Sequence, residues 1–184
     1  MAQGTVQTPR AFNTMMLAEV SVMIALAVVL DALRLYTLPQ GGTITVGEMV
    51  PILFVALRRG ARVGIFAGTV FGIIDVYFEP FVYNPVQFLL DYPIAYGALG
   101  LAGLFKQRGV VQTAIGVAVA IGCRFVSHFV SGIIFFASFA LSAGESPAVY
   151  SAIYNATYLL PGLVISEFVI IVLVRGGALR FRMQ

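Results

Sequence analysis

The stretch VVQTAIGVAVAIGCRFVSHFVSGIIFFASFA, residues 110–140, decides the class of fold. It holds two ionisable side chains, Arg124 and His128, among residues that are mostly apolar or small. A helix that crosses the hydrocarbon core of a bilayer needs roughly 20 mostly apolar residues. The stretch therefore predicts a membrane-spanning helix.

Similar apolar stretches follow one another along the rest of the chain. The predicted helices cover about residues 15–38, 44–57, 63–78, 81–105, 110–140 and 148–174. The second and third are short for a span, and none shows the period-two alternation of a transmembrane barrel. We therefore predict an all-α integral membrane protein with six transmembrane helices.

The composition agrees with this class. Of the 184 residues, 60% are hydrophobic and 10% are charged, and the mean hydropathy is +0.96. These values exclude a water-soluble monomer, whose surface needs more charge, and an intrinsically disordered chain. The length fits one transmembrane domain over residues 1–184, with short tails at about 1–14 and 175–184.

The basic residues indicate the orientation in the membrane. In a six-helix arrangement, nine of the eleven Lys and Arg residues fall on one side. They are Arg10, Arg58, Arg59, Arg62, Lys106, Arg108, Arg175, Arg180 and Arg182. Basic loops lie on the cytoplasmic side, so both termini are predicted to be cytoplasmic. Omitting one short helix would scatter these loops over both faces.

Polar side chains inside the predicted spans need a reason, because a central charge costs about 2.5–3.5 kcal/mol on insertion scales. Asn84, Gln87 and Asp91 are spaced to share one face of the fourth helix. His128, the single histidine, shares a face of the fifth helix with Arg124. Such groups point either to a binding site or to hydrogen bonds between helices.

Aromatic and amide groups complete this set. Phe136 lies two turns beyond His128, and Tyr150 and Asn155 lie near the start of the sixth helix. In the six-helix topology Asp91, Tyr92, Tyr150 and Asn155 all fall in the outer half of the membrane. Together these groups would suit a small, flat, partly cationic organic ligand.

Other functions find little support in the sequence. It contains no GxSxG, HExxH or GxxxxGK[ST] motif, and an enzyme is therefore not predicted. One cysteine and one histidine do not form a metal-ligand cluster, so neither a metal nor a cofactor is expected. The basic residues do not form an aromatic-interleaved patch, which argues against nucleic acid as a partner.

Several segments together resemble a known family. They are AEVSVMIALA at residues 18–27, EMVPILFVALRRG at 48–60, FLLDYPIAYGALGLAGLF at 88–105, RFVSHFVSGIIFF at 124–136 and AVYSAIYN at 148–155. In this order they resemble the thiamine-specific S components (the ThiT family) of energy-coupling-factor (ECF) vitamin transporters. The likeness runs from about residue 17 to 172.

The resemblance implies a set of ligand-binding residues. The family's acidic residue and the tyrosine after it fall on Asp91 and Tyr92, and its histidine falls on His128. A stacking tryptophan of the family falls on Phe136. Its tyrosine and asparagine fall on Tyr150 and Asn155. The family usually has Glu at the position of Asp91, so this site has a shorter acid and a phenyl ring for an indole.

The resemblance also implies partners. S components dock on a transmembrane T component with two cytoplasmic ATPase subunits, and they reside in the plasma membrane. The docking motif, small-xxx-small, falls on Ser21 and Ala25 of the first helix, and ordinary helix packing is the alternative for these two residues.

The resulting hypothesis is high-affinity thiamine (vitamin B1) binding and uptake as the S component of an ECF-type ABC importer. A second possibility keeps the fold but changes the ligand to another vitamin or a pyrimidine precursor. A third is a membrane interaction protein without a transported ligand, in which the buried polar groups bond to one another.

Overall fold

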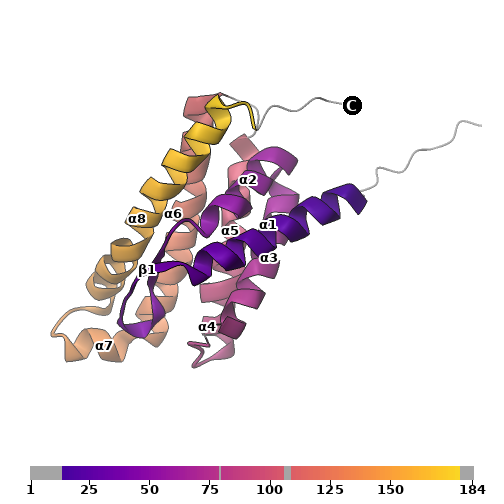
Figure 1. Cartoon of the computed structure of the whole chain (residues 1–184). Helices are drawn as coiled ribbons and strands as arrows, with labels where there is room; N and C mark the ends of the chain where they lie inside the picture. The colour runs from indigo at the N-terminus through magenta and orange to yellow at the C-terminus, as the bar shows by residue number, and fades with distance from the viewer. Residues whose placement is uncertain (1–13, 79, 106–108, 179–184) are drawn as a thin grey trace, which may run out of the picture.

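The computed structural model describes residues 14–78, 80–105 and 109–178, which form a helical bundle with one short hairpin (Figure 1). The long helices are α1 (Thr14–Ala32), α3 (Ala61–Phe78), α6 (Val110–Phe135) and α8 (Pro147–Arg175). Shorter elements are β1 (Arg34–Thr37), η1 (Pro39–Gly41), β2 (Thr43–Thr45), α2 (Met49–Arg59), α4 (Pro85–Leu89), η2 (Leu90–Ile94), α5 (Ala95–Ala98), η3 (Leu99–Phe105) and α7 (Ala137–Ser142). The predicted tails lie largely outside the described residues.

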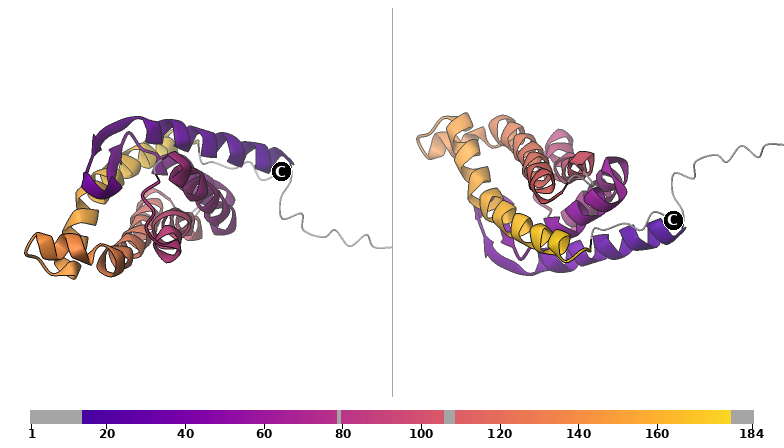
Figure 2. Two further views of the ribbon diagram at one scale, coloured as in Figure 1. Left: turned by 90° about the horizontal axis from the view of Figure 1, so that it is seen from below. Right: turned by 90° about the horizontal axis from the view of Figure 1, so that it is seen from above.

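Five helices in the described part of the chain are long and apolar enough to cross a membrane. They are α1, α3, the continuous helical segment Pro85–Phe105, α6 and α8. Seen end-on, α1 lies along one side of the bundle and α6 lies across from it (Figure 2). The prediction of a helical membrane protein is confirmed in that the chain is mostly helical and has candidate membrane spans, whereas the predicted number of six is not confirmed.

The remaining predicted span, α2, is an eleven-residue helix in the middle of the bundle. At 1.5 Å per residue it is roughly 16 Å long, about half the hydrocarbon thickness. Nine of its residues, Met49 to Leu57, are buried. A helix that is apolar on all sides is one surrounded by other protein, which is why its sequence resembles a span.

The boundary of the first predicted helix was wrong. We expected a helix to residue 38 and another from residue 44, but α1 ends at Ala32 and an antiparallel hairpin of β1 and β2 follows. Pro39 removes a backbone donor, and Gly41 has φ of 87°, so the chain turns here. Thr37, Thr43 and Thr45 are β-branched and favour strands.

The segment 85–105 is helical but irregular where Asp91 lies. Residues Leu90–Ile94 form a π turn that contains Pro93. Proline lacks an N–H and its ring clashes with the carbonyl four residues earlier, and a wider turn relieves both problems. The Ser127 hydroxyl of α6 donates to the Leu90 carbonyl oxygen at 2.6 Å. The neighbouring helix α6 thus supplies a hydrogen-bond donor to this carbonyl oxygen, because the lipid chains contain none.

A row of small residues lets α3 lie against this irregular segment. Gly64, Gly68 and Gly72 are buried at four-residue spacing. A Cβ atom on Gly68 or Gly72 would collide with the backbone carbonyl of Tyr96 or Tyr92, respectively. The absence of side chains therefore permits backbone contact between α3 and both the π turn, at Gly72, and α5, at Gly68.

The fifth predicted helix also ends earlier than expected. We expected it to run to residue 140, but α6 ends at Phe135, and Phe136 has φ of −113° and ψ of 14°. The separate helix α7 begins at Ala137 and bends away (Figure 1). The break turns the chain at Phe136, at the same end of the bundle as the hairpin.

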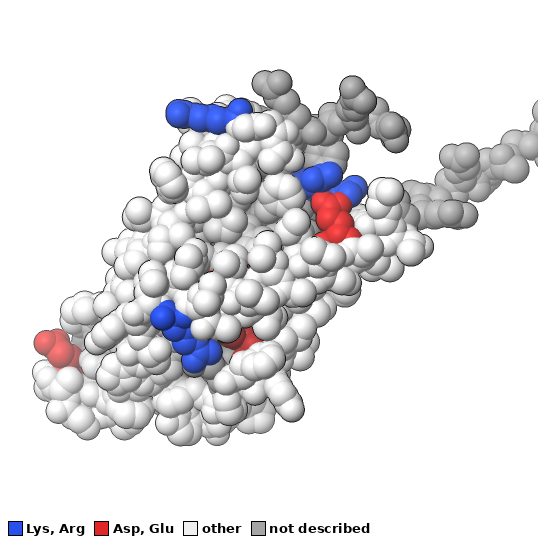
Figure 3. Space-filling view, in the orientation of Figure 1, with Lys and Arg blue, Asp and Glu red and all other residues white. Residues whose placement is uncertain are grey.

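Four of the described arginines lie at the end of the bundle away from the hairpin, and the exposed Arg34 lies in the hairpin itself. Arg58 and Arg59 end α2, Arg62 lies in the first turn of α3, and Arg175 ends α8 (Figure 1). Figure 3 shows basic atoms both at that end and lower on the molecule. Both arginines of α2 contact Glu19 of α1, Arg58 at 3.1 Å. The other end carries the hairpin, α7 and the exposed Glu145. Lys106, Arg108, Arg180 and Arg182, together with Arg10, lie outside the described residues.

Candidate functional site

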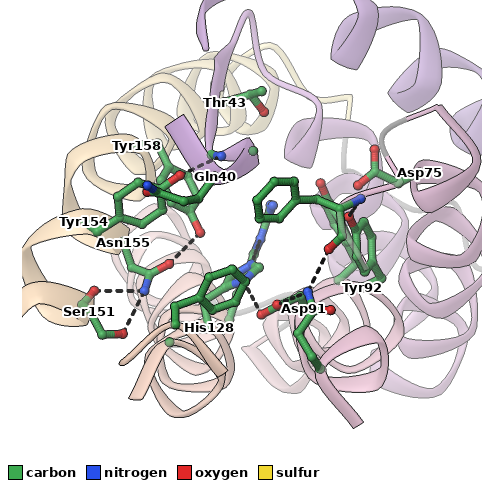
Figure 4. A pocket seen from close by; sticks show the side chains of 18 of the residues that line it. Gln40, Thr43, Asp75, Asp91, Tyr92, His128, Ser151, Tyr154, Asn155 and Tyr158 are labelled. Carbon is green, nitrogen blue, oxygen red and sulfur yellow. Dashed lines mark hydrogen bonds and ion pairs between the residues drawn. The ribbon is translucent and has the colours of Figure 1, made fainter. Parts of the chain in front are cut away.

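A cavity lies between the hairpin, the π turn, α6 and α8 (Figure 4). Its volume is about 100 Å³. Its lining residues are Asp31, Gln40, Gly41, Gly42, Thr43, Asp75, Phe81, Gln87, Asp91, Tyr92, Tyr96, Arg124, His128, Gly132, Phe136, Tyr150, Ser151, Tyr154, Asn155 and Tyr158. Side chains thus reach one cavity from positions more than 120 residues apart along the chain.

Three side chains hydrogen-bond to the Asp91 carboxylate in the cavity. Its Oδ2 accepts from Gln87 Nε2 at 2.7 Å and from Ser131 Oγ at 2.8 Å, and its Oδ1 contacts His128 Nδ1 at 3.1 Å. A carboxylate offers about four acceptor positions. Three are used within the protein, so about one remains for a ligand.

Gln87 connects Asp91 to the loop before α4. Its Nε2 also donates to the Phe81 carbonyl oxygen at 2.9 Å, and its Oε1 accepts from Tyr83 N at 3.0 Å. The side chain is 1% exposed and has all its hydrogen-bonding groups engaged. Asn84, expected on the same face, instead caps the start of α4 by accepting from Val86 N at 2.8 Å.

The wall formed by α8 presents an amide and phenol groups. Asn155 Nδ2 donates to the Ser151 carbonyl oxygen at 2.8 Å, and its Oδ1 accepts from the Tyr158 hydroxyl at 2.7 Å. Gly132 of α6 faces Ser151, and a Cβ atom there would collide with the Ser151 side chain. The close approach of the two helices brings this wall opposite Asp91 (Figure 4).

Aromatic rings cover one part of the cavity. The Phe136 ring lies parallel to that of Phe81, with centroids 6.0 Å apart and planes within 8°. Tyr92 packs on Phe88 at 5.9 Å, and its hydroxyl accepts from Phe81 N at 3.3 Å. Parallel and near-parallel rings provide flat apolar surfaces that match a planar heteroaromatic ligand.

The hairpin tip closes the cavity through contacts with α8. The Tyr150 hydroxyl donates to Gln40 Oε1 at 3.2 Å. The Tyr154 hydroxyl accepts from Gly42 N at 2.9 Å and donates to the Pro39 carbonyl oxygen. Gln40 has φ of 65°, the left-handed conformation that turns the tip towards α8. Ligand entry from this end therefore requires these contacts to open.

A second group of charged side chains lies on the other side of the cavity. Asp31 of α1 and Asp75 of α3 are 6% and 8% exposed. Asp31 lies 3.6 Å from Arg34, and the Tyr96 hydroxyl hydrogen-bonds to Asp75. Three aspartates and one arginine, Arg124, line the cavity. The lining therefore holds more acidic than basic side chains.

All six predicted ligand-binding residues line this cavity: Asp91, Tyr92, His128, Phe136, Tyr150 and Asn155. Tyr150 and Asn155 both reach it although they are five residues apart, because Tyr150 lies in the first turn of α8 and its side chain is long. Ser21 and Ala25 lie elsewhere, on the exposed face of α1.

Sequence reasoning left several lining residues out of the predicted site. Asp31, Asp75 and Arg124 carried the relevant signal, since each is an ionisable residue inside a predicted span or at its end. Tyr154 and Tyr158 follow Tyr150 at four-residue spacing on one face of a helix. Gln40 and Phe81 lie in turns, and no periodic pattern pointed to them. Within the described residues no group of His, Cys, Asp and Glu could hold a metal ion.

A cavity lined by charged, polar and aromatic side chains among apolar helices defines a multi-pass membrane protein with a candidate binding site for a small molecule. The model of the family described as thiamine transporter protein (Thia_YuaJ) matches residues 17–179. The chain belongs to this family, the ThiT thiamine transporters, as the sequence predicted, and it is a multi-pass protein of the plasma membrane.

Individual relatives agree with this assignment. The chain is 35% identical over 172 residues to the thiamine transporter ThiT of Bacillus subtilis (strain 168), which covers 85% of this chain and 88% of that protein. It is 30% identical over 141 residues to ThiT of Lacticaseibacillus paracasei, covering 68% and 70%. The structure of ThiT from Listeria monocytogenes matches with a TM-score of 0.76 at 21% identity, over 89% of this chain and 95% of that one, and so shares the fold.

The hairpin contacts lead to a first prediction. The substitution Tyr154→Phe removes the acceptor of the Gly42 amide, and amide exchange at Gly42 should accelerate by roughly 2–12-fold, equivalent to about 0.5–1.5 kcal/mol. Hydrogen exchange followed by mass spectrometry measures this. Tyr77→Phe, at a ring that is 84% exposed on α3, serves as the control and should leave Gly42 unchanged. Equal exchange at Gly42 in the two variants would show that the Tyr154 hydroxyl does not hold the hairpin tip.

Proposed function

We propose that this protein binds thiamine with high affinity in the cavity and serves as the S component of an ECF-type ABC importer. Membership of the thiamine transporter family supports the ligand. The observation that carries the proposal is the convergence of the Asp91 carboxylate, His128, Asn155 and parallel aromatic rings on one cavity. Thiamine presents an aminopyrimidine ring and a permanently cationic thiazolium, and it needs all of these partners.

The aminopyrimidine ring would lie between the Asp91 side and α8. Asp91 accepts from its amino group through the one remaining acceptor position, while Asn155 and Tyr150 hydrogen-bond to the ring nitrogens. His128 and Phe136 provide the stacking surfaces. Since Asn155 and Tyr150 already hold protein partners, each would exchange or share a hydrogen bond when the ligand enters.

The thiazolium ring would lie towards Tyr92, Asp75 and Asp31. Asp91 is engaged by three donors, and Arg124 is paired with Glu48 at 3.3 Å. Of the three lining aspartates, Asp75 and Asp31 then remain for the cation, and Asp31 also lies 3.6 Å from Arg34. A cation in an enclosed site of low dielectric gains more from such charges than it would in water. Tyr92 adds a π face.

The topology consistent with this role has six crossings. Strand β2, the turn at residues 46–48 and α2 would together lead from the hairpin to the arginine-rich end, which completes a crossing that α2 alone is too short to make. Both termini would be cytoplasmic with Arg58, Arg59 and Arg175, and the cavity would lie in the outer half of the membrane.

Transport would depend on partners, because the family motifs for ATP hydrolysis are absent from the sequence and the proposed role involves no catalysis. The exposed face of α1 with Ser21 and Ala25 would dock on the transmembrane T component, where small residues permit close approach of helices. Two cytoplasmic ATPase subunits would drive reorientation of the bundle.

The second prediction concerns the ligand. Purified protein should bind thiamine, and Asp91→Asn should weaken binding by at least about 100-fold, because an acceptor for the ligand becomes a donor facing Gln87, Ser131 and His128. Calorimetric titration measures both. Glu145→Gln, at an exposed residue between α7 and α8, is the matched control and should bind as the wild type does.

Wild-type protein that binds thiamine only at millimolar concentration, or not at all, would exclude thiamine as the ligand. The shorter acid and the phenyl ring at Phe136 favour a competition panel of other vitamins and pyrimidine precursors in that case. Tight binding of one of these compounds would then assign the alternative ligand.

The third prediction separates the two rings of the ligand. At a pH where the Asp75 carboxyl is ionised, Asp75→Asn should weaken thiamine binding by roughly 15–20-fold, since a carboxylate and a cation taken as about 10 Å apart interact by roughly 1.7 kcal/mol at an effective dielectric of about 20. Affinity for a neutral 4-aminopyrimidine lacking the thiazolium should stay the same. A parallel loss for both compounds in calorimetry would show that Asp75 acts on folding or on the pyrimidine side.

The fourth prediction concerns docking. Ala25→Leu should leave thiamine binding intact but reduce co-purification with the T component by about tenfold, because added methylenes separate packed helices. Val126→Leu is the control, on an outward face of α6 where the side chain is 57% exposed. Unchanged co-purification of Ala25→Leu would assign this face of α1 to lipid.

A further inference from the structure

Arg124 lines the cavity and contacts three other side chains. It is 4% exposed, its Nη1 lies 3.3 Å from Glu48 Oε1, and its guanidinium carbon lies 3.9 Å from the centre of the Tyr96 ring. Its Nε donates to His128 Nε2 at 3.3 Å. The salt bridge and the cation–π contact hold the guanidinium in a fixed direction, with Nε aimed at the imidazole.

The direction of this hydrogen bond determines where the His128 proton lies. An arginine side chain has donors and no acceptor. His128 Nε2 must therefore accept, and in the neutral imidazole the proton lies on Nδ1. Nδ1 faces Asp91 Oδ1 at 3.1 Å and donates to it. In the opposite tautomer, the protonated Nε2 would face the Arg124 Nε donor, and the unprotonated Nδ1 would face the Asp91 Oδ1 acceptor. Neither hydrogen bond could then form.

The chain of hydrogen bonds also reaches the base of the hairpin. Glu48 Oε2 accepts from the Thr45 hydroxyl, and Thr45 ends β2. The order of groups is Thr45, Glu48, Arg124, His128 and Asp91, and the last three line the cavity. Every donor in this series faces a carboxylate or an unprotonated nitrogen. Each group is therefore fixed as a hydrogen-bond donor or acceptor by its neighbours.

We propose that Arg124 is a positioning residue that fixes His128 as an Nδ1–H donor, makes Asp91 an obligate acceptor and so selects ligands with a ring amine over ring carbonyls. The inference rests on the proposed function, in that the selected ligand is thiamine. Gln87, Ser131 and His128 occupy Asp91 as donors. A carbonyl oxygen placed at the remaining position would meet a carboxylate oxygen, and neither could donate.

The first measurement reads the tautomer directly. His128 is the single histidine of the chain, so protein labelled with ¹⁵N- and ¹³C-histidine gives one imidazole spin system. In ligand-free wild-type protein, Nδ1 should carry the proton and Nε2 should not. Arg124→Lys, which keeps a donor and a positive charge, should preserve this state. A proton on Nε2 in the wild type would overturn the proposal, whether or not thiamine binds.

The second measurement tests the preference for a ring amine over a ring carbonyl. Arg124→Met alone would leave Glu48 as an unpaired buried charge, so it is combined with Glu48→Gln and compared with Glu48→Gln alone. Calorimetry gives the affinity for thiamine and for its 4-oxo analogue. The preference for the amine should fall by at least about tenfold in the double variant relative to the single variant, the loss of roughly one hydrogen bond. Arg124→Lys should retain the preference.

The outcomes separate this inference from the proposed function. If wild-type protein fails to bind thiamine, the proposed function fails, and the tautomer measurement still decides the role of Arg124. If thiamine binds but the preference for the amine is the same in the double variant and in Glu48→Gln, Arg124 does not set selectivity. A lower affinity for both compounds by the same factor would assign Arg124 a structural role.

Discussion

The carboxylate of Asp91, 14% exposed inside a membrane-spanning segment, must find its hydrogen-bond donors within the protein. The arrangement around the cavity follows from this requirement. Its donors come from the same segment, Gln87, and from α6, Ser131 and His128, so α6 must lie close to the π turn. Gly72 of α3 also contacts the backbone of the π turn. A charge that would be costly in lipid is thereby placed where the Pro85–Phe105 segment contacts both α6 and α3.

The parts of this arrangement that depend on composition and periodicity could be predicted from the sequence. The five long spans follow from apolar length, and the bounds predicted for α8 differ from the observed ones by one residue at each end. The hairpin could not be predicted, because Leu33, Leu35 and Tyr36 extend the apolar pattern of α1 beyond its end. Their side chains are exposed, and what stops the helix is the turn at Pro39 and Gly41 and pairing with β2.

The candidate site divides in a similar way. Family resemblance located the six side chains that meet at the cavity, but it gave no account of the groups that hold them. Arg124 and Glu48 are 76 positions apart, and Asp31 and Asp75 belong to different helices, so their proximity depends on tertiary packing that no local pattern records. Gln87 was visible as a polar residue on the Asp91 face, whereas its bonds to Phe81 and Tyr83 depend on the path of a loop.

The short length of α2 explains how one structure can combine an enclosed cavity with a cover that can open. Because α2 is short, the chain between α1 and α2 can enter the bundle as a hairpin. Thr45 at the end of β2 bonds to Glu48, and Glu48 pairs with Arg124 at the cavity wall. The hairpin tip is held by tyrosine hydroxyls of α8, whereas its base is fixed by a buried salt bridge. Exposed or half-buried hydrogen bonds to a tip break at little net cost, about 0.5–1.5 kcal/mol each, while breaking a buried ion pair costs several times more. Opening should therefore begin at the tip and leave the Arg124–His128–Asp91 geometry in place for the incoming ligand.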